Sequence, residues 1–284
     1  MEKKALPVVR TIQETIAGIG ANPVLLVPFL LVALSNACVL IIAYFAPRYP
    51  LSIVMAPPIR RFMGQQFLHY PQHLLVLPRL YQDGSLVVSF IGGLLATAYA
   101  LFLLQQYKKG EQKIDIAAGL LLAVRNYIKM ILVFTLFFFF AKVAGKGALK
   151  IVTALVSAPH AVVFISIGVD IILITLVQAI AFFIFPSFII GGKKLVAGIL
   201  EGIRLFVKYG RSVFVLVLLP TLLFIISRVI FMENGALMTV FGPGIIVASL
   251  AITIVITLCV DVFVTLFSGY AYTMVKNAND ESVG

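Results

Sequence analysis

Long apolar stretches alternate with short polar segments along this chain. Five of the stretches carry little or no charge over the roughly 20 residues that a helix needs to cross the hydrocarbon core of a membrane. A sixth is shorter, but it is long enough if Lys129 and Lys142 at its two ends extend to the lipid headgroups. The pattern therefore predicts six transmembrane helices, at residues 24–46, 86–104, 127–144, 161–185, 212–232 and 245–274.

A short amphipathic segment precedes each odd-numbered span. In the first, residues 5–19, apolar side chains recur at steps of three and four residues while Arg10 and Glu14 lie on other faces. Such a helix is suited to the membrane interface. The other two segments are residues 114–126 and 193–208, and the polar breaks that follow the three are at residues 20–23, 126–129 and 209–212. We therefore expect an all-α integral membrane protein of three transmembrane hairpins, each preceded by a cytoplasmic interfacial helix.

The longest segment outside the predicted spans is an outer loop, residues 47–84. It holds six prolines, but also large apolar side chains that favour a position on the membrane face. Pro58 suits the first turn of a helix. That helix would carry an apolar stripe formed by Ile59, Phe62, Met63, Gln66, Phe67 and Tyr70. No segment has the character of a soluble domain, so residues 1–284 are expected to form a single polytopic membrane domain.

The net charge of +11 narrows the class of partner. The basic residues flank apolar spans and form no continuous patch with interleaved aromatic residues, which disfavours nucleic acid. Anionic lipid headgroups are the expected partner. With both termini inside, the cytoplasmic segments hold 14 of the 22 Lys and Arg residues. The positive-inside rule therefore predicts an N-in, C-in protein of the prokaryotic cytoplasmic (inner) membrane.

Two acidic residues, Asp170 and Asp261, fall inside predicted spans, where an ionised side chain is costly unless it is paired or hydrated. One interpretation is a substrate or proton path between the fourth and sixth spans. The other is structural: Asp170 or Asp261 pairs with Arg228 or Lys142, and the hydroxyl groups of the sixth span bond across helices or to their own backbone. Asp170 and Arg228 are the better pair, because both lie towards the outer half of the membrane. The candidate intramembrane polar or transport residues are Asp170, Gln178, Arg228, Thr257, Asp261 and Thr265.

Sequence motifs for chemistry are missing. There is no His-Glu-x-x-His, no phosphate-binding loop and no nucleophilic serine with a companion histidine in the membrane. His69 and His73 have a spacing that can hold a metal, but Pro71 between them disfavours a continuous helix. Cys38 and Cys259 have no second Cys or His at ligand spacing. We therefore expect no catalytic residue, no cofactor and no metal, and a protein that is not an enzyme.

Three short sequences carry a resemblance: GIGANPVLLVPFLLVAL, AVRNYIKMILVFTLFFF and FVKYGRSVFVLVLLPTLLF, each after an amphipathic segment. In these the chain resembles a group of uncharacterised prokaryotic six-span membrane proteins, which includes the membrane domain fused to some glycerophosphoryl diester phosphodiesterases. The phosphodiesterase barrel itself is absent here, so the resemblance implies no catalytic residue. The chain is also similar to the six-span permease half of exporters of the ABC-2 type, which begin with an interfacial helix.

Two functions remain open from the sequence. The first is a non-catalytic subunit or scaffold of an envelope membrane complex, which contacts anionic lipids through its surface helices and binds other membrane-protein subunits. The alternative is a transporter or ABC-2-like permease subunit that uses Asp170 and Asp261.

Overall fold

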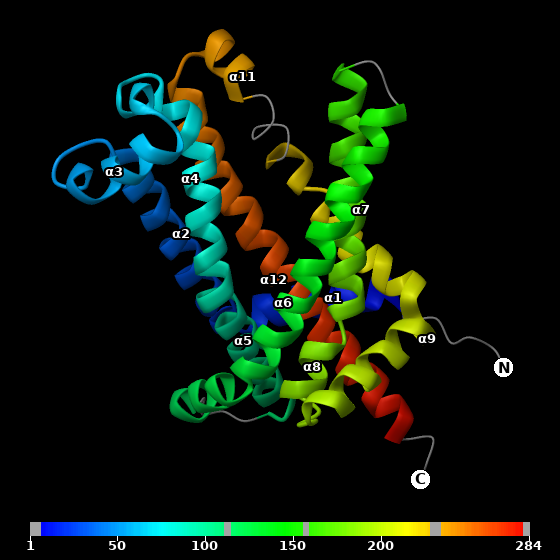
Figure 1. Cartoon of the computed structure of the whole chain (residues 1–284). Helices are drawn as coiled ribbons and strands as arrows, with labels where there is room; N and C mark the ends of the chain where they lie inside the picture. The colour runs from blue at the N-terminus through cyan, green and yellow to red at the C-terminus, as the bar shows by residue number, and fades with distance from the viewer. Residues whose placement is uncertain (1–6, 111–114, 156–158, 228–233, 281–284) are drawn as a thin grey trace. The chain divides into compact units, whose positions relative to one another are not determined.

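The computed structural model describes residues 7–110, 115–155, 159–227 and 234–280. Within these ranges the protein is helical and has no strand. This is the expected result for an apolar chain, because each helix satisfies its own backbone hydrogen bonds without water. The elements are α1 (Val8–Ala21), η1 (Pro23–Leu26), α2 (Val27–Phe45), α3 (Ser52–Phe62), η2 (Gln65–Leu68), α4 (His73–Val88), η3 (Ser89–Gly93), α5 (Leu94–Lys108), α6 (Ile116–Leu155), α7 (Pro159–Ala181), α8 (Ile184–Ile189), α9 (Leu195–Thr221), α11 (Asn234–Phe241) and α12 (Gly244–Asp280) (Figure 1).

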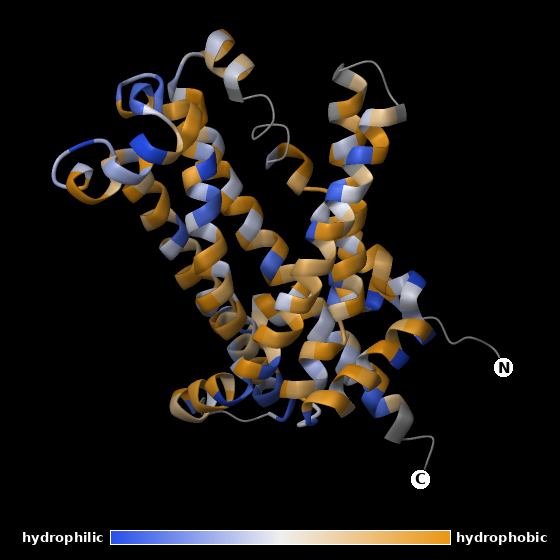
Figure 2. Ribbon diagram, in the orientation of Figure 1, coloured by the Kyte–Doolittle hydropathy of each residue, from blue (hydrophilic) through white to orange (hydrophobic). Residues whose placement is uncertain are grey.

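Five helical segments in the described part of the chain are long and apolar enough to cross a membrane. They are Pro23–Phe45, His73–Lys108, Ile116–Ala154, Phe164–Ile189 and Gly244–Ala278. Figure 2 shows hydrophobic residues along most of α2 and α12. The protein is therefore a multi-pass helical membrane protein by length and composition, as the sequence predicts.

The sixth predicted span, residues 212–232, is described only in part. Residues 212–221 are the last turns of α9, and residues 228–233 lie outside the described ranges. A sixth crossing therefore stays a prediction.

Two of the three predicted polar breaks are wrong. The helix α6 runs without interruption through residues 126–129, and α9 runs through residues 209–212. Neither break contains a proline, and their Asn, Tyr, Lys, Arg and Ser side chains are compatible with a helix interior. The first break is confirmed, since α1 ends at Ala21 and Pro23 opens the 3₁₀ turn η1.

The predicted outer loop, residues 47–84, contains α3, η2 and the first part of α4. The helix expected to begin at Pro58 and continue to Tyr70 is a wrong prediction: Pro58 lies inside α3, which ends at Phe62. Gly64 explains the end of the helix. Its φ of +112° is outside the helical region and suits glycine.

The chain divides into two compact units. Unit 1 comprises the residues up to Phe29, Gly93–Leu222 and the residues from Cys259 onward, and unit 2 comprises Leu30–Gly92 and Leu223–Leu258. In unit 1, α5 packs on α6, α6 on α7, α7 on α9, and α8 on α9. Its core includes the fully buried side chains Met130, Phe183, Phe188 and Leu216, and Tyr272 of α12.

Unit 2 has its own core, formed by α2, α4 and the first half of α12. Its buried members are Leu40, Ala43, Leu74, Leu77, Tyr81, Ile246, Leu250 and Ile254. Between α4 and α5 the chain makes a π-helical turn, η3, which contains Gly92 and Gly93.

Candidate functional site

The first surface helix, α1, contacts unit 1 through its small polar face. Thr11, Thr15 and Gly18 are buried, whereas Val9 and Ile16 on the opposite side are 68% and 57% exposed. The Thr15 hydroxyl donates to the Thr11 carbonyl at 2.8 Å, so its polar atom is satisfied within the helix. Val9 and Ile16 belong to the predicted apolar stripe, whereas Ile12 of the same stripe packs against the core of unit 1. The sequence did not predict which face of the helix binds the protein.

The contacts of α1 with the rest of unit 1 are close. Gly18 lies directly against the hydroxyl group of Tyr270 in α12, where a larger side chain has no room. Glu14 accepts a hydrogen bond of 3.3 Å from Lys108 at the end of α5, and the Lys108 ammonium lies 4.5 Å from the centre of the Tyr270 ring. These contacts hold α1 against the rest of unit 1, through the close approach of Gly18 to Tyr270 and the ion pair of Glu14 with Lys108.

The first turns of α6 repeat this arrangement. Gly119 and Ala123 are buried, and a Cβ atom on Gly119 would fall 2.7 Å from the ring of Phe102. On the outward side Leu120, Leu121 and Val124 are exposed. Asp115 caps the helix by accepting a hydrogen bond from the Ala118 amide at 2.9 Å.

The first half of α9 has the same arrangement of small buried residues on one face and exposed apolar residues on the other. Gly198 and Gly202 are buried against α8, and a Cβ atom on Gly202 would lie 2.9 Å from the backbone nitrogen of Ile184. The exposed residues of the opposite face are Val196, Leu200, Ile203 and Val207. We call the three buried sets (Thr11, Thr15 and Gly18; Gly119 and Ala123; Gly198 and Gly202) the small-residue faces. Their spacing of three or four residues, with Gly-x-x-x-Gly at 198–202, is a signal for close helix packing that the apolar stripe does not reveal.

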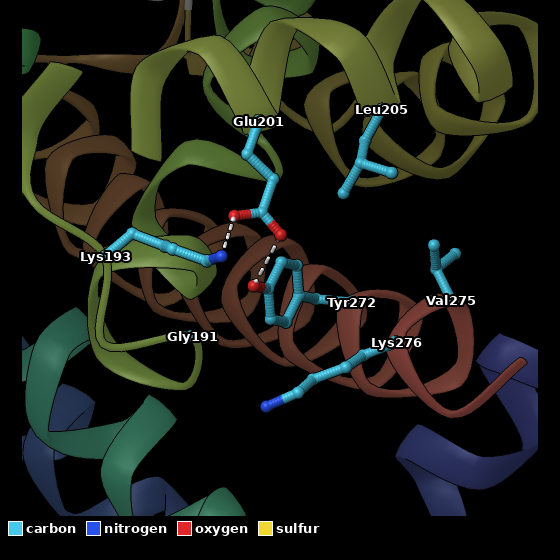
Figure 3. A pocket seen from close by; sticks show the side chains of 7 residues that line it. All are labelled: Gly191, Lys193, Glu201, Leu205, Tyr272, Val275 and Lys276. Atoms are coloured by element: carbon cyan, nitrogen blue, oxygen red, sulfur yellow. Dashed lines mark hydrogen bonds and ion pairs between the residues drawn. The ribbon is translucent and has the colours of Figure 1, made fainter. Parts of the chain in front are cut away.

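A polar pocket lies where the α8–α9 loop, α9 and α12 meet within unit 1 (Figure 3). Its volume is about 240 Å³, well above the about 30 Å³ that one water molecule occupies. The residues that line it are Gly191, Lys193, Glu201, Leu205, Tyr272, Val275 and Lys276.

Glu201 is the centre of the polar contacts in this pocket, with one hydrogen bond and one ion pair. Its Oε1 accepts a hydrogen bond of 3.0 Å from the Tyr272 hydroxyl, and its Oε2 lies 3.7 Å from the ammonium of Lys193. Figure 3 shows both side chains directed at the carboxylate, from α12 and from the loop. Glu201 Oε2 is buried and accepts no hydrogen bond from the described residues. Besides its ion pair with Lys193, this oxygen can therefore still accept a hydrogen bond.

The loop that carries Lys193 is fixed by α8 and α9. Ser187 donates to the carbonyls of Ile184 and Gly198, at 2.7 and 3.0 Å, and so ties α8 to α9. Gly192 has a φ of +63°, a turn conformation that suits glycine. Lys129 of α6 donates to the Lys193 carbonyl at 3.4 Å. These hydrogen bonds therefore fix the backbone of the loop that carries Lys193.

The five described residues among the six predicted for intramembrane chemistry do not line this pocket. Thr257 donates to the Thr253 carbonyl at 2.9 Å, and Thr265 is buried in α12. Gln178 of α7 accepts a hydrogen bond of 3.1 Å from Thr221 of α9. Asp261 is half-buried in α12, and Asp170 lies in α7 opposite Gly145 of α6. Arg228 lies outside the described residues, so its pairing with Asp170 stays a prediction.

Among the described residues no group of three or more His, Cys, Asp or Glu side chains could hold a metal ion. The pocket was not predicted from the sequence. Lys193 and Glu201 lie eight residues apart, but Tyr272 and Lys276 come from more than 70 residues further along the chain, and no local motif joins the four.

No family model, curated protein or solved structure matches this chain. Its function is therefore inferred from its own residues and contacts.

Proposed function

We propose that this protein is a non-catalytic, multi-pass subunit or scaffold of a complex in a prokaryotic cytoplasmic membrane, and that it contacts anionic lipid through its surface helices. The observation that carries the proposal is the repeated arrangement in α1, α6 and α9. Each helix buries a small-residue face against unit 1 and leaves branched apolar side chains exposed.

The exposed face of α9 supports lipid contact. Val196, Leu200 and Val207 are more than 60% exposed, and contact of such side chains with water is unfavourable in proportion to their apolar area. In contact with acyl chains that cost disappears. Arg204 and Lys208 are exposed on the same helix, where they can reach anionic headgroups.

The topology is part of this proposal. Six crossings, arranged as three hairpins with both termini in the cytoplasm, are supported by the distribution of Lys and Arg along the chain. The apolar continuation of α9 through Val213–Thr221 supports a crossing that starts in that helix.

A role in a complex is tested by co-purification. The full chain, extracted in mild detergent after crosslinking in cells, is expected to bring defined membrane-protein partners, identified by mass spectrometry against a mock purification. A protein that is reproducibly free of partners after crosslinking would contradict the scaffold role.

Lipid contact of the surface helices is tested separately with spin labels. A nitroxide at Ile16→Cys is expected to be more accessible to oxygen, which partitions into lipid, than to a water-soluble nickel chelate. Lys109→Cys, at an exposed position after α5, is the control and should show the opposite ratio. Both variants are made in a chain lacking Cys38 and Cys259. An aqueous signal at position 16 would contradict lipid contact by α1.

Transport is the second candidate, and Asp261 favours it. This half-buried carboxylate lies within the apolar segment Gly244–Ala278, and among the described residues no ion pair joins it to a cation. An acid in such a place is a recurrent element of proton and substrate pathways.

A further inference from the structure

The pocket between α9 and α12 contains two lysine side chains whose hydrogen-bonding capacity is not used within the described part of the chain. Lys193 lies 3.7 Å from Glu201, which is within ion-pair range but too long for a hydrogen bond. Lys276 also lines the pocket and is exposed. Each ammonium has three donors. The two lysines and Glu201 leave the pocket with a net charge of +1, which favours an anion with several acceptor oxygens.

We infer that this pocket binds the phosphate group of a phospholipid, held between Lys193 and Lys276. The inference rests on the proposed lipid contact of unit 1 and names its ligand. Phosphate oxygens accept hydrogen bonds from ammonium groups, and such charge-assisted bonds are among the strongest in proteins. Glu201 serves as the counter-ion of Lys193 when the pocket is empty, and the phosphate replaces it there.

The surroundings of the pocket favour a lipid over a free phosphate ion. Leu205 and Val275 form an apolar wall beside the charged groups (Figure 3). Tyr272, Val275 and Lys276 also lie in the last turns of the membrane-length segment Gly244–Ala278, and the ends of such segments are the parts that reach lipid headgroups. An amphiphile can place its phosphate on the lysines and its apolar part along this wall.

The test is native mass spectrometry of the full chain, released from a phosphate-free detergent and titrated with phosphatidylglycerol. Lys193→Gln and Lys276→Gln are each expected to weaken binding about tenfold, the loss of one charge-assisted hydrogen bond. Lys194→Gln is the matched control, because it removes the same charge from the neighbouring exposed position, which does not line the pocket. It should bind as the wild type does.

The variant Glu201→Gln distinguishes an effect of charge on lipid affinity from structural disruption of the pocket. This variant removes the charge that competes for Lys193, so we expect binding to strengthen by severalfold. If the substitutions merely disrupt the pocket, then Lys193→Gln, Lys276→Gln and Glu201→Gln would all lower the affinity for phosphatidylglycerol. That result would overturn the inference. Wild-type affinity in both Lys193→Gln and Lys276→Gln would overturn it as well.

A competition arm identifies the source of the phosphate. Inorganic phosphate at millimolar concentration should displace little phosphatidylglycerol, because it gains nothing from the apolar wall. Displacement at concentrations equal to those of the lipid would overturn the lipid assignment. None of these results bears on co-purification with partner proteins, so failure here leaves the proposed role in a complex standing and is distinguishable from its failure.

Discussion

The hydroxyl of Tyr272 donates a hydrogen bond of 3.0 Å to Glu201, a residue 71 positions earlier in the chain. Tyr272 is almost fully buried in α12, and Glu201 lies in α9 between Gly198 and Gly202, the two glycines that pack against α8. This bond therefore ties α12 to α9, the helix whose exposed apolar face is proposed to contact lipid.

Tyr272→Phe removes this bond and keeps the ring. A hydrogen bond to a charged group contributes about 1.5–3 kcal/mol, and the partial exposure of Glu201 places the expected loss at the lower end. The measurement is the midpoint of thermal unfolding in detergent. Tyr49→Phe, at a position that is 83% exposed, is the control and should change little. Equal stability of the two variants would show that the Tyr272 bond contributes nothing.

Gly202→Ala tests the contact of α9 with α8. The added methyl group would lie 2.9 Å from the backbone of Ile184, and overpacking of this kind costs about 1–3 kcal/mol. We expect a lower unfolding midpoint in detergent.

Gly147→Ala is the matched control for that substitution. Gly147 lies in α6 with open space around it, so alanine should be neutral or stabilising, by about 0.5–1 kcal/mol for a helix interior. A stabilised Gly202→Ala protein would show that α8 and α9 do not approach as closely as described.

The predicted orientation is tested by cysteine labelling in intact cells with a membrane-impermeant reagent. Single cysteines replace exposed residues in a chain that lacks Cys38 and Cys259: Lys109, Lys194, Gln66 and Lys146. Both termini inside means that positions 66 and 146 react and positions 109 and 194 do not. The reverse pattern would invert the topology.

Asp261→Asn distinguishes the two candidate functions. The amide keeps the shape of the side chain and removes its charge, so a transporter should lose flux while its fold and amount in the membrane are unchanged. Thr257→Val is a useful companion, because the Thr257 hydroxyl is already satisfied by its own helix. Unchanged flux and assembly in Asp261→Asn would exclude Asp261 from any coupling role.

Hydropathy was sufficient to predict the class of fold and five of the membrane-length helices, because burial of about 20 apolar residues in lipid is a property of each segment alone. Hydropathy was less able to predict whether an amphipathic segment and the span after it form one continuous helix. Asn126 is polar, yet it is buried inside α6, where its amide donates to the Leu122 carbonyl at 3.0 Å. A polar residue that finds a partner one turn earlier does not break a helix, and hydropathy alone cannot show this.

The candidate pocket could not be predicted for a different reason. Lys193, Glu201 and Tyr272 come together only through the packing of α8, α9 and α12. The small-residue face of α9 could have been predicted from the sequence, because Gly198 and Gly202 have the four-residue spacing that is typical of close helix contacts. A search for apolar stripes identifies the outward face of such a helix, and small residues identify the inward one.

The small-residue faces have a consequence for redesign of this protein. In α9 the side chains that meet the surroundings, such as Leu200 and Val207, are separate from those that meet α8, such as Gly198 and Gly202. Polar residues could therefore replace the outward set while the close contacts of Gly198 and Gly202 with α8 are kept. The same substitutions in α1 and α6 would convert three exposed apolar surfaces into polar ones, while the small-residue faces of unit 1 stay those of the natural protein.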